Sequence, residues 1–323
     1  MHFLKRFVLQ LLDVVLAPLV LPSALLMRLL RRAGLQRMPL CRKSLSAAGV
    51  FPIVDHYYEP LINFSLLNHP LEDPRNLPGI DLNISEQLEI LQGMNFRDEL
   101  NVLMAGQQKD NAAERVYVAE NGFFDAGDAE YWYNLIRSRK PRRIIEIGSG
   151  NSTLVAIAAL KKNKEELSGY QCRHVCIEPY EMPWLEQSGV EVIRARVETV
   201  DQTVFRELEA GDILFIDSSH VIRPQGDVLC EFLELLPILR KGVIVHVHDI
   251  FTPRDYPTDW VVGHVRLWGE QYLLEAYLSE NSRWKIIGAL NFLKHDHFAE
   301  LQKACPTLTL AHEPGSFYLE KTA

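Results

Sequence analysis

An apolar segment followed by a run of small residues most constrains how this chain can fold. Residues 142–160 read RRIIEIGSGNSTLVAIAAL, in which Ile144–Ile147 has a strand pattern and the Ala- and Leu-rich end has helical periodicity. Gly148 and Gly150 let the backbone turn sharply between the two elements and approach a ligand closely. The free amides at the start of the helix face the same point. We therefore predict a strand, a tight turn and a helix, with a polar ligand on the turn.

The residues of this turn separate two classes of ligand. A dinucleotide fingerprint, GxGxxG, would need a third glycine at the position of Thr153. An acid at the strand end followed by alternating small residues instead resembles motif I of the class I methyltransferases that use S-adenosylmethionine (SAM), where the acid serves the cationic amino-acid end of the cofactor. The resemblance implies a SAM-binding set: Glu146, Gly148, Ser149, Gly150 and Ser152. A turn whose glycines serve only backbone packing is the alternative.

Composition and charge narrow the class of partner. The chain has 323 residues, enough for one large α/β domain with a cap, and its formal net charge is −8. An acidic chain argues against a nucleic-acid backbone as the partner and favours a small molecule or a saccharide acceptor. The five cysteines form no CxxC pair, which suits a reducing compartment such as the cytoplasm.

The N-terminal stretch Phe7–Leu30 is dominated by Leu, Val and Ala and has basic residues on both sides. It is nearly long enough to span a bilayer, but Asp13 lies inside it and Pro18 and Pro22 interrupt it. We predict a helix, a break and a second helix that lie in the cytoplasmic leaflet, with the arginines at anionic headgroups on the inner face of the plasma membrane. The alternative is a helical pair buried against the catalytic domain or against the partner in a homo-oligomer.

The remainder of the chain alternates apolar strands with helices, which predicts a parallel sheet covered on both faces. Residues 1–48 are expected to form the N-terminal helices, 49–127 a cap over the acceptor and 128–323 the catalytic domain. The expected helices are Ser85–Leu100, Asp128–Arg139 and Trp268–Leu278. The expected strands are Ile144–Ile147, Arg173–Glu178, Val190–Ala195, Asp212–Asp217, Val243–Val247, Trp284–Leu290 and Ser316–Leu319. Seven strands match the Rossmann-like sheet of the class I methyltransferases.

The ends of the second and third strands carry further candidate cofactor ligands. Ligands of α/β sheets lie at the carboxyl ends of parallel strands, where an acid can hold ribose hydroxyls. Glu178 has that position, and Tyr180 is expected beside the adenine. The methyltransferase resemblance further places Glu198 at the adenine edge.

Two strand ends carry a high density of ionisable groups, Asp217-Ser218-Ser219-His220 and His246-Val247-His248-Asp249. Neighbouring parallel strands bring these ends together, and a divalent metal would relieve the clustering of charge. The arrangement resembles metal-dependent O-methyltransferases of the catechol, macrolide-sugar and cephalosporin-tailoring groups, and is similar to methyltransferase family 24. Two carboxylates and several imidazoles could therefore share one site.

The resemblance assigns roles to these residues. It implies that Asp217, His248 and Asp249 hold the metal and that His220 or His248 is the general base. A histidine ligand shifts the preference from Mg²⁺ toward Mn²⁺, Fe²⁺ or Zn²⁺. The alternative is a metal-free site in which Asp217 and Asp249 orient SAM and the acceptor. His246 is expected to be a hydrogen-bonded histidine of the core.

These observations predict a SAM-dependent O-methyltransferase acting on a hydroxyl group. The loop Phe251–Pro257 is expected to close over the acceptor, where Arg254 could engage an anionic or sugar group. A metal-dependent hydroxylase on the same scaffold and a non-catalytic, membrane-associated module that binds SAM or a nucleotide are the alternatives. Methyl transfer from labelled SAM distinguishes the methyltransferase from the hydroxylase.

Overall fold

The computed structural model describes residues 2–106 and 115–323, and the chain divides into two compact units. We call residues 1–68 the N-terminal unit and residues 69–323 the sheet unit. The division does not follow the boundaries expected after residues 48 and 127, since most of the expected cap groups with the sheet. Positions 107–114 of that cap lie outside the described residues.

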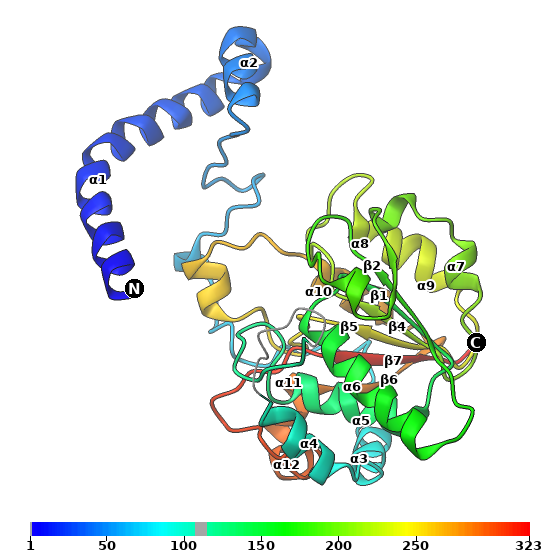
Figure 1. Cartoon of the computed structure of the whole chain (residues 1–323). Coiled ribbons are helices and arrows are strands. Elements are labelled where there is room, and N and C mark those ends of the chain that lie inside the picture. Colours follow the sequence, from blue (N-terminus) through cyan, green and yellow to red (C-terminus); the bar gives the residue numbers. More distant parts are fainter. Residues whose placement is uncertain (1, 107–114) are drawn as a thin grey trace. The chain divides into compact units, whose positions relative to one another are not determined.

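The N-terminal unit begins with α1 (His2–Ala33), one continuous helix. The predicted break at Pro18 and Pro22 is wrong, because both prolines lie inside α1. A proline removes one helical hydrogen bond and displaces the carbonyl four residues earlier, which can bend a helix without ending it, and Figure 1 shows α1 bent along its length. The helix ends instead at Gly34, whose φ of +87° is a left-handed conformation that glycine adopts freely.

Short helices complete this unit: η1 (Leu35–Arg37), α2 (Pro39–Ala47) and η2 (Phe64–Leu66). Over Leu4–Ala33, α1 is long and apolar enough to cross a membrane, and that stretch is not buried within the described part of the chain. A signal sequence has the same length and composition, whereas the core helix of a soluble protein would be buried.

The sheet unit is built on seven strands in the order β3-β2-β1-β4-β5-β7-β6. Their bounds are β1 Arg143–Ile147, β2 Arg173–Ile177, β3 Glu191–Ile193, β4 Ile213–Ile216, β5 Ile244–Val247, β6 Trp284–Ala289 and β7 Phe317–Lys321. The first five are parallel, and β7 lies antiparallel between β5 and β6. The predicted seven-stranded Rossmann-like sheet is confirmed, with a mixed rather than wholly parallel pairing.

Helices cover both faces of this sheet, with α5 and α6 on one face and α8, α9 and α10 on the other (Figure 1). The longer ones are α3 (Ile84–Gln92), α4 (Arg97–Met104), α5 (Asp128–Arg139), α6 (Asn151–Glu166) and α10 (Glu270–Leu278). Shorter ones are η4 (Leu185–Gln187), η5 (Val197–Thr199), α7 (Thr203–Arg206), α8 (Asp227–Cys230), η6 (Glu231–Leu235), α9 (Leu236–Ile238), η7 (Asp259–Gly263), α11 (Leu290–Asp296) and α12 (Phe298–Ala304). The single helix expected over Ser85–Leu100 is two helices, because α3 ends at Gly93.

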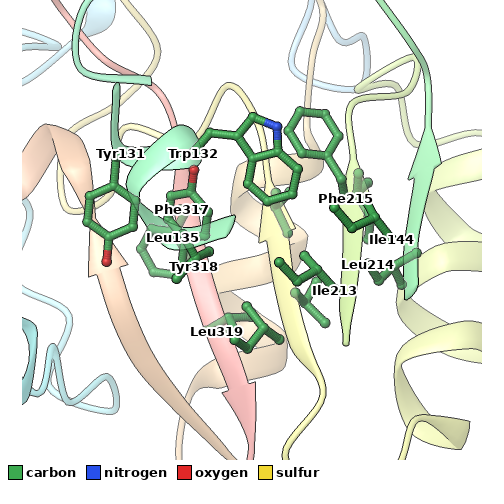
Figure 2. Packing of buried hydrophobic residues seen from close by; sticks show 14 of the residues in the cluster. Tyr131, Trp132, Leu135, Ile144, Ile213, Leu214, Phe215, Phe317, Tyr318 and Leu319 are labelled. Carbon is green, nitrogen blue, oxygen red and sulfur yellow. The ribbon is translucent and has the colours of Figure 1, made fainter. Parts of the chain in front are cut away.

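The core lies where α5 packs on the central strands, as Figure 2 shows. Trp132 of α5 is fully buried, its ring centroid is 5.2 Å from that of Phe215 on β4, and its indole N–H donates to the carbonyl of Ser152 at 3.2 Å. Tyr131 donates through its hydroxyl to the carbonyl of Ile287 on β6 at 2.8 Å. Since both polar groups are satisfied, these large rings can be buried without an unpaired donor.

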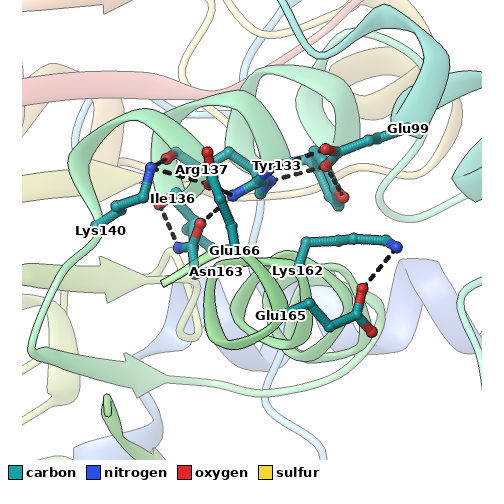
Figure 3. A network of polar contacts seen from close by, with 9 residues as sticks. All are labelled: Glu99, Tyr133, Ile136, Arg137, Lys140, Lys162, Asn163, Glu165 and Glu166. Carbon is teal, nitrogen blue, oxygen red and sulfur yellow. Dashed lines mark hydrogen bonds and ion pairs between the residues drawn. The ribbon is translucent and has the colours of Figure 1, made fainter. Parts of the chain in front are cut away.

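A buried arginine ties three helices together on the same side of the sheet (Figure 3). Arg137 of α5 donates to both carboxylate oxygens of Glu99 on α4, at 2.7 and 2.9 Å, and to Glu166 on α6 at 2.9 Å. It also donates to the buried Asn163 side chain, and its guanidinium lies 4.5 Å from the centroid of the Phe96 ring. The bidentate pair joins α5 to α4, and the bond to Glu166 joins α5 to α6, the helix that begins directly after the turn that follows β1.

Candidate functional site

The turn after β1 packs directly on the end of β4. Gly148 has a φ of +76°, and a Cβ atom at this position would lie 1.8 Å from the carbonyl oxygen of Asp217. Only glycine fits there. Gly150 differs from the expectation, since its φ of 175° is ordinary extended backbone and an added Cβ would meet only the Met182 side chain, at 3.7 Å. The close approach therefore depends on Gly148 alone.

Glu146 stabilises this turn through hydrogen bonds to residues of α6. Its carboxylate is fully buried and accepts hydrogen bonds from Ser152 at 3.0 Å and Thr153 at 2.8 Å, and it lies 2.5 Å from Nε2 of His174 on β2. Neither Glu146 nor the buried Ser152 borders the adjoining cavity. Their polar atoms hold the turn, and the direct contact of Glu146 and Ser152 with the cofactor stays a prediction. Ser149 also does not line the cavity, although its hydroxyl is buried and has no partner among the described residues.

A cavity of about 770 Å³ opens beside the turn, which is within the usual size range of small-molecule and cofactor sites. Five of the predicted cofactor residues line it: Gly148, Glu178, Tyr180, Glu198 and Asp217. One carboxylate oxygen of Glu178 accepts the backbone amides of Tyr180 and Glu181, both at 3.0 Å. Those bonds fix the orientation of the Glu178 carboxylate, and Tyr180 is 79% exposed at the rim.

At the far side of Asp217, three ionisable side chains converge. Nε2 of His220 lies 3.3 Å from a carboxylate oxygen of Asp217 and 3.4 Å from one of Asp249. One ligand atom from each residue lies within 4.8 Å of the others, so this trio could hold a metal ion. His220 and Asp249 have φ values of +60° and +59°. Such conformations are costly for residues other than glycine and tend to occur at functional sites.

This trio differs in one member from the predicted metal set, which named His248 where His220 lies here and which stays a prediction. His248 is buried, its Nε2 lies 3.5 Å from Asp249, and its ring packs against Phe124 at 5.1 Å between centroids. It shares a face of the chain with His246, two residues earlier, and so points toward α5 and the core. His220 takes its place beside both aspartates. His246 is a core residue as expected, but neither of its ring nitrogens has a hydrogen-bond partner among the described residues.

Glu270 is the main functional candidate that the sequence did not suggest. It lies at the start of α10, is fully buried and is 2.7 Å from Nδ1 of His220. Burial alone would lower the pKa of His220, but hydrogen bonds to Asp217 and Glu270 outweigh it and raise that pKa well above the ordinary value when no cation is bound. Burial raises the pKa of Glu270 itself. An acid in the first turn of a helix is so common that nothing in the linear sequence connects it with a histidine 50 residues away.

An aromatic wall borders the same cluster. The ring of Trp268 lies 4.2 Å from that of His220. The guanidinium of Arg266 packs against both Trp260 and Trp268, 4.2 and 4.4 Å from their ring centroids. Arg254, which was expected to face the acceptor, instead has its guanidinium 3.5 Å from Asp296. The predicted acceptor loop ends at residue 257. The residues of the aromatic wall come after it in the chain.

Known proteins give an independent view of the same region. Residues 145–250 match the model of a family described as a methyltransferase domain. An uncharacterized protein of Archaeoglobus fulgidus is 29% identical over 178 residues, which cover 51% of this chain and 76% of that protein.

Two solved structures share the arrangement more distantly. An O-methyltransferase from Bacillus cereus in complex with SAH has a TM-score of 0.37 and 16% identity, covering 74% of this chain and 91% of that chain. TomG of Streptomyces achromogenes, in complex with SAM, has a TM-score of 0.37 and 16% identity, covering 72% and 99%. Likeness at this level adds nothing to what the sheet itself shows. Residues 145–250 thus match a methyltransferase domain and lie on the seven-stranded sheet that the resemblance to class I methyltransferases predicted.

Proposed function

We propose that this chain transfers a methyl group from SAM to a hydroxyl of a small molecule or saccharide, assisted by a divalent cation. One observation carries the proposal: Asp217 belongs both to the cavity beside the Gly148 turn and to the cluster with His220 and Asp249. A cofactor in the cavity and an acceptor hydroxyl at the cluster would therefore meet at this residue. Positioning two reactants in this way can supply about 7–11 kcal/mol of the barrier.

The cavity suits SAM. The Gly148 turn leaves room for backbone approach, and the fixed carboxylate of Glu178 would accept hydrogen bonds from the ribose hydroxyls. Tyr180 and Glu198 would border the adenine. In this proposal Glu146 acts indirectly, by holding the turn through Ser152 and Thr153.

The donor set at the cluster fits a divalent cation. The carboxylates of Asp217 and Asp249 supply oxygen ligands, which suit Mg²⁺ or Mn²⁺ when His220 is kept free as the base. Asp217 and Asp249 would hold the ion, which would lower the pKa of the acceptor hydroxyl. The Nδ1–H of His220 donates a hydrogen bond to Glu270. The lone pair of Nε2 would then face the hydroxyl group of the acceptor molecule.

The proposed chemical step is the transfer of the methyl group to the acceptor oxygen. Nε2 of His220 takes the hydroxyl proton, the oxygen forms a bond to the methyl carbon, and the bond from that carbon to the sulfonium sulfur breaks, which leaves the neutral thioether. Trp268 packs against His220 and would exclude water from this proton transfer.

Calorimetry with SAM tests the cofactor half. Glu178→Ala should weaken SAM binding at least about tenfold, which is 1.4 kcal/mol, whereas Glu165→Ala, on the exposed side of α6, should not change it. Equal affinities in wild type and both variants would refute the assignment.

Metal analysis and single-turnover assays with labelled SAM test the catalytic half. Asp217→Asn and Asp249→Asn should lose the bound metal and the activity but keep SAM. A His220→Ala protein that also loses its metal would make His220 a ligand rather than the base. Full activity after chelation would exclude the cation, and consumption of oxygen without methyl transfer would favour a hydroxylase.

We also place the sheet unit in the cytoplasm, with the N-terminal unit in contact with a membrane. Five free cysteines, three of them buried, support a reducing compartment. The exposed apolar surface of α1 supports membrane contact.

A further inference from the structure

The surface of α1 is apolar on every side. From Leu4 to Leu29 its exposed large apolar side chains are between 46% and 71% accessible. The successive residues Val14, Val15 and Leu16 are all among them, and three consecutive residues point about 100° apart on a helix. A helix lying in the plane of a leaflet needs a polar face, and from residue 14 to residue 27 the only polar side chain is Ser23.

The length of this apolar stretch matches a bilayer. Phe7 to Met27 comprises 21 residues, which at about 1.5 Å per residue gives about 31 Å, close to the roughly 30 Å of a hydrocarbon core. Asp13 lies six residues from its start, about 9 Å from that boundary. Prolines are tolerated within membrane helices. The hydroxyl of Ser23 donates to the carbonyl of Leu19 at 2.8 Å, so this polar group is satisfied within the helix.

The C-terminal end of α1 is built differently. After Gly34 the chain folds back, and Leu30, Leu35 and Leu45 form a small buried cluster that holds α2 against the end of α1. We call residues 28–43 the basic elbow, because this segment carries Arg28, Arg31, Arg32, Arg37, Arg42 and Lys43. Only Lys5 and Arg6 precede the apolar stretch, so the positive charge is six to two in favour of the C-terminal side. Such asymmetry places that side in the cytoplasm.

Aromatic residues are held at the level of the basic elbow. Arg31 donates through Nε to Glu59 at 2.8 Å, and its guanidinium lies 5.1 Å from the centroid of the Phe51 ring. Next to Glu59, Tyr57 and Tyr58 are 91% and 85% exposed. Tyrosines and basic side chains gathered at one end of an apolar helix are typical of a membrane–water interface.

We propose that α1 crosses the bilayer once, with its N-terminal end outside the cytoplasm and the basic elbow and Tyr57–Tyr58 at the cytoplasmic headgroups. The span replaces the predicted helix pair lying in one leaflet. A homo-oligomer in water would also have to cover every face of α1, and it would leave the charge asymmetry unexplained. The inference specifies the proposed membrane contact and does not depend on methyl transfer.

Sealed vesicles with the cytoplasmic face outward, prepared from cells that make the full chain with one tag before Met1 and another after Ala323, test the span. The protein should stay in the membrane pellet after alkaline carbonate extraction. Protease should remove the C-terminal tag and spare the N-terminal tag until detergent is added. Release by carbonate would show a surface-bound helix, digestion of both tags a helix that does not cross, and loss of the N-terminal tag a cleaved signal sequence. Each result would overturn the proposal.

A matched pair of variants links the result to α1. Leu16→Arg combined with Leu19→Arg places charge at mid-span and should lower the carbonate-resistant fraction at least about tenfold. Leu40→Arg changes a leucine that is 80% exposed but belongs to the basic elbow, and it should leave that fraction unchanged. Near-UV circular dichroism should show the sheet unit folded in both. An equal loss, or no loss, in the two proteins would refute the proposal.

Discussion

The close contact at Gly148 yields the sharpest prediction for the cofactor turn. Replacing Gly148 by alanine puts a methyl group 1.8 Å from the carbonyl oxygen of Asp217, whereas real Cβ atoms essentially never approach within 3.0 Å. The turn or the end of β4 must therefore move by at least the difference, 3.0 − 1.8 = 1.2 Å. Both elements are fixed by the buried core, so the movement is costly.

The magnitude follows from two contributions. A left-handed φ costs alanine about 1–2 kcal/mol, and overpacking a well-packed site costs about 1–3 kcal/mol. We therefore expect Gly148→Ala to lower the free energy of unfolding by about 2–5 kcal/mol and to abolish measurable SAM binding, because the added methyl group distorts the turn that borders the cofactor cavity. Gly150→Ala is the matched control, and with its extended backbone and open surroundings it should cost less than about 1 kcal/mol.

Urea unfolding of the two variants in the same detergent, followed by calorimetry with SAM, measures both effects. If Gly148→Ala and Gly150→Ala are equally stable and bind SAM equally well, the turn does not pack on β4 as described. Reduced stability with unchanged SAM affinity would support the packing of the turn on β4 but refute the binding of the cofactor at the turn.

Further predictions concern residues around and beyond the site. His220→Ala should slow the chemical step about 10²- to 10⁴-fold in single-turnover assays, and Glu270→Gln about 10- to 100-fold, the usual effect of losing a carboxylate that orients a histidine near a metal; undiminished turnover in His220→Ala would move the base to His248. Burial lowers the pKa of His246 well below its ordinary value, so the unfolded chain binds the proton more readily and stability should be full above about pH 6.5 and fall as the pH drops below it. His246→Phe should flatten that slope in urea titrations at several pH values, and an unchanged slope would contradict the assignment. Arg137→Met should cost about 1–3 kcal/mol, because it leaves the buried Asn163 acceptor unpaired, while Lys162→Met, at the exposed pair with Glu165, should cause no measurable loss.

The sequence predicted the sheet well because each strand has a local signal. Apolar runs such as Ile213–Ile216 are buried throughout, and their boundaries differ from the prediction by only a few residues. Gly148 could be singled out because a glycine directly after an apolar strand usually marks a sharp backbone turn. The continuity of α1 could not be predicted, since proline usually ends a helix in water and the bend that accommodates Pro18 and Pro22 leaves no trace in sequence.

The candidate site was predictable only in part, because its geometry joins distant segments. Asp217 and Asp249 follow neighbouring strands, so their approach follows from topology alone. The exchange of His248 for His220 depends on which way a side chain points after its strand ends, and the alternation that carries His246 into the core also carries His248 there. Glu270 reaches the cluster because the backbone amides of Gly269 and Glu270 donate to the carbonyl of His220, a long-range contact that no local pattern encodes.

The position of β7 between β5 and β6 also governs how the protein is made. On the ribosome, residues 244–247 and 284–289 are complete well before residues 317–321 emerge, so one edge of β5 and the whole of β6 have no partner until then. During that interval the unpaired edges of β5 and β6 can pair with other chains. α1 is synthesised before the strands of the sheet. Nascent chains whose α1 is already in a membrane would be kept apart from one another until β7 pairs with β5 and β6.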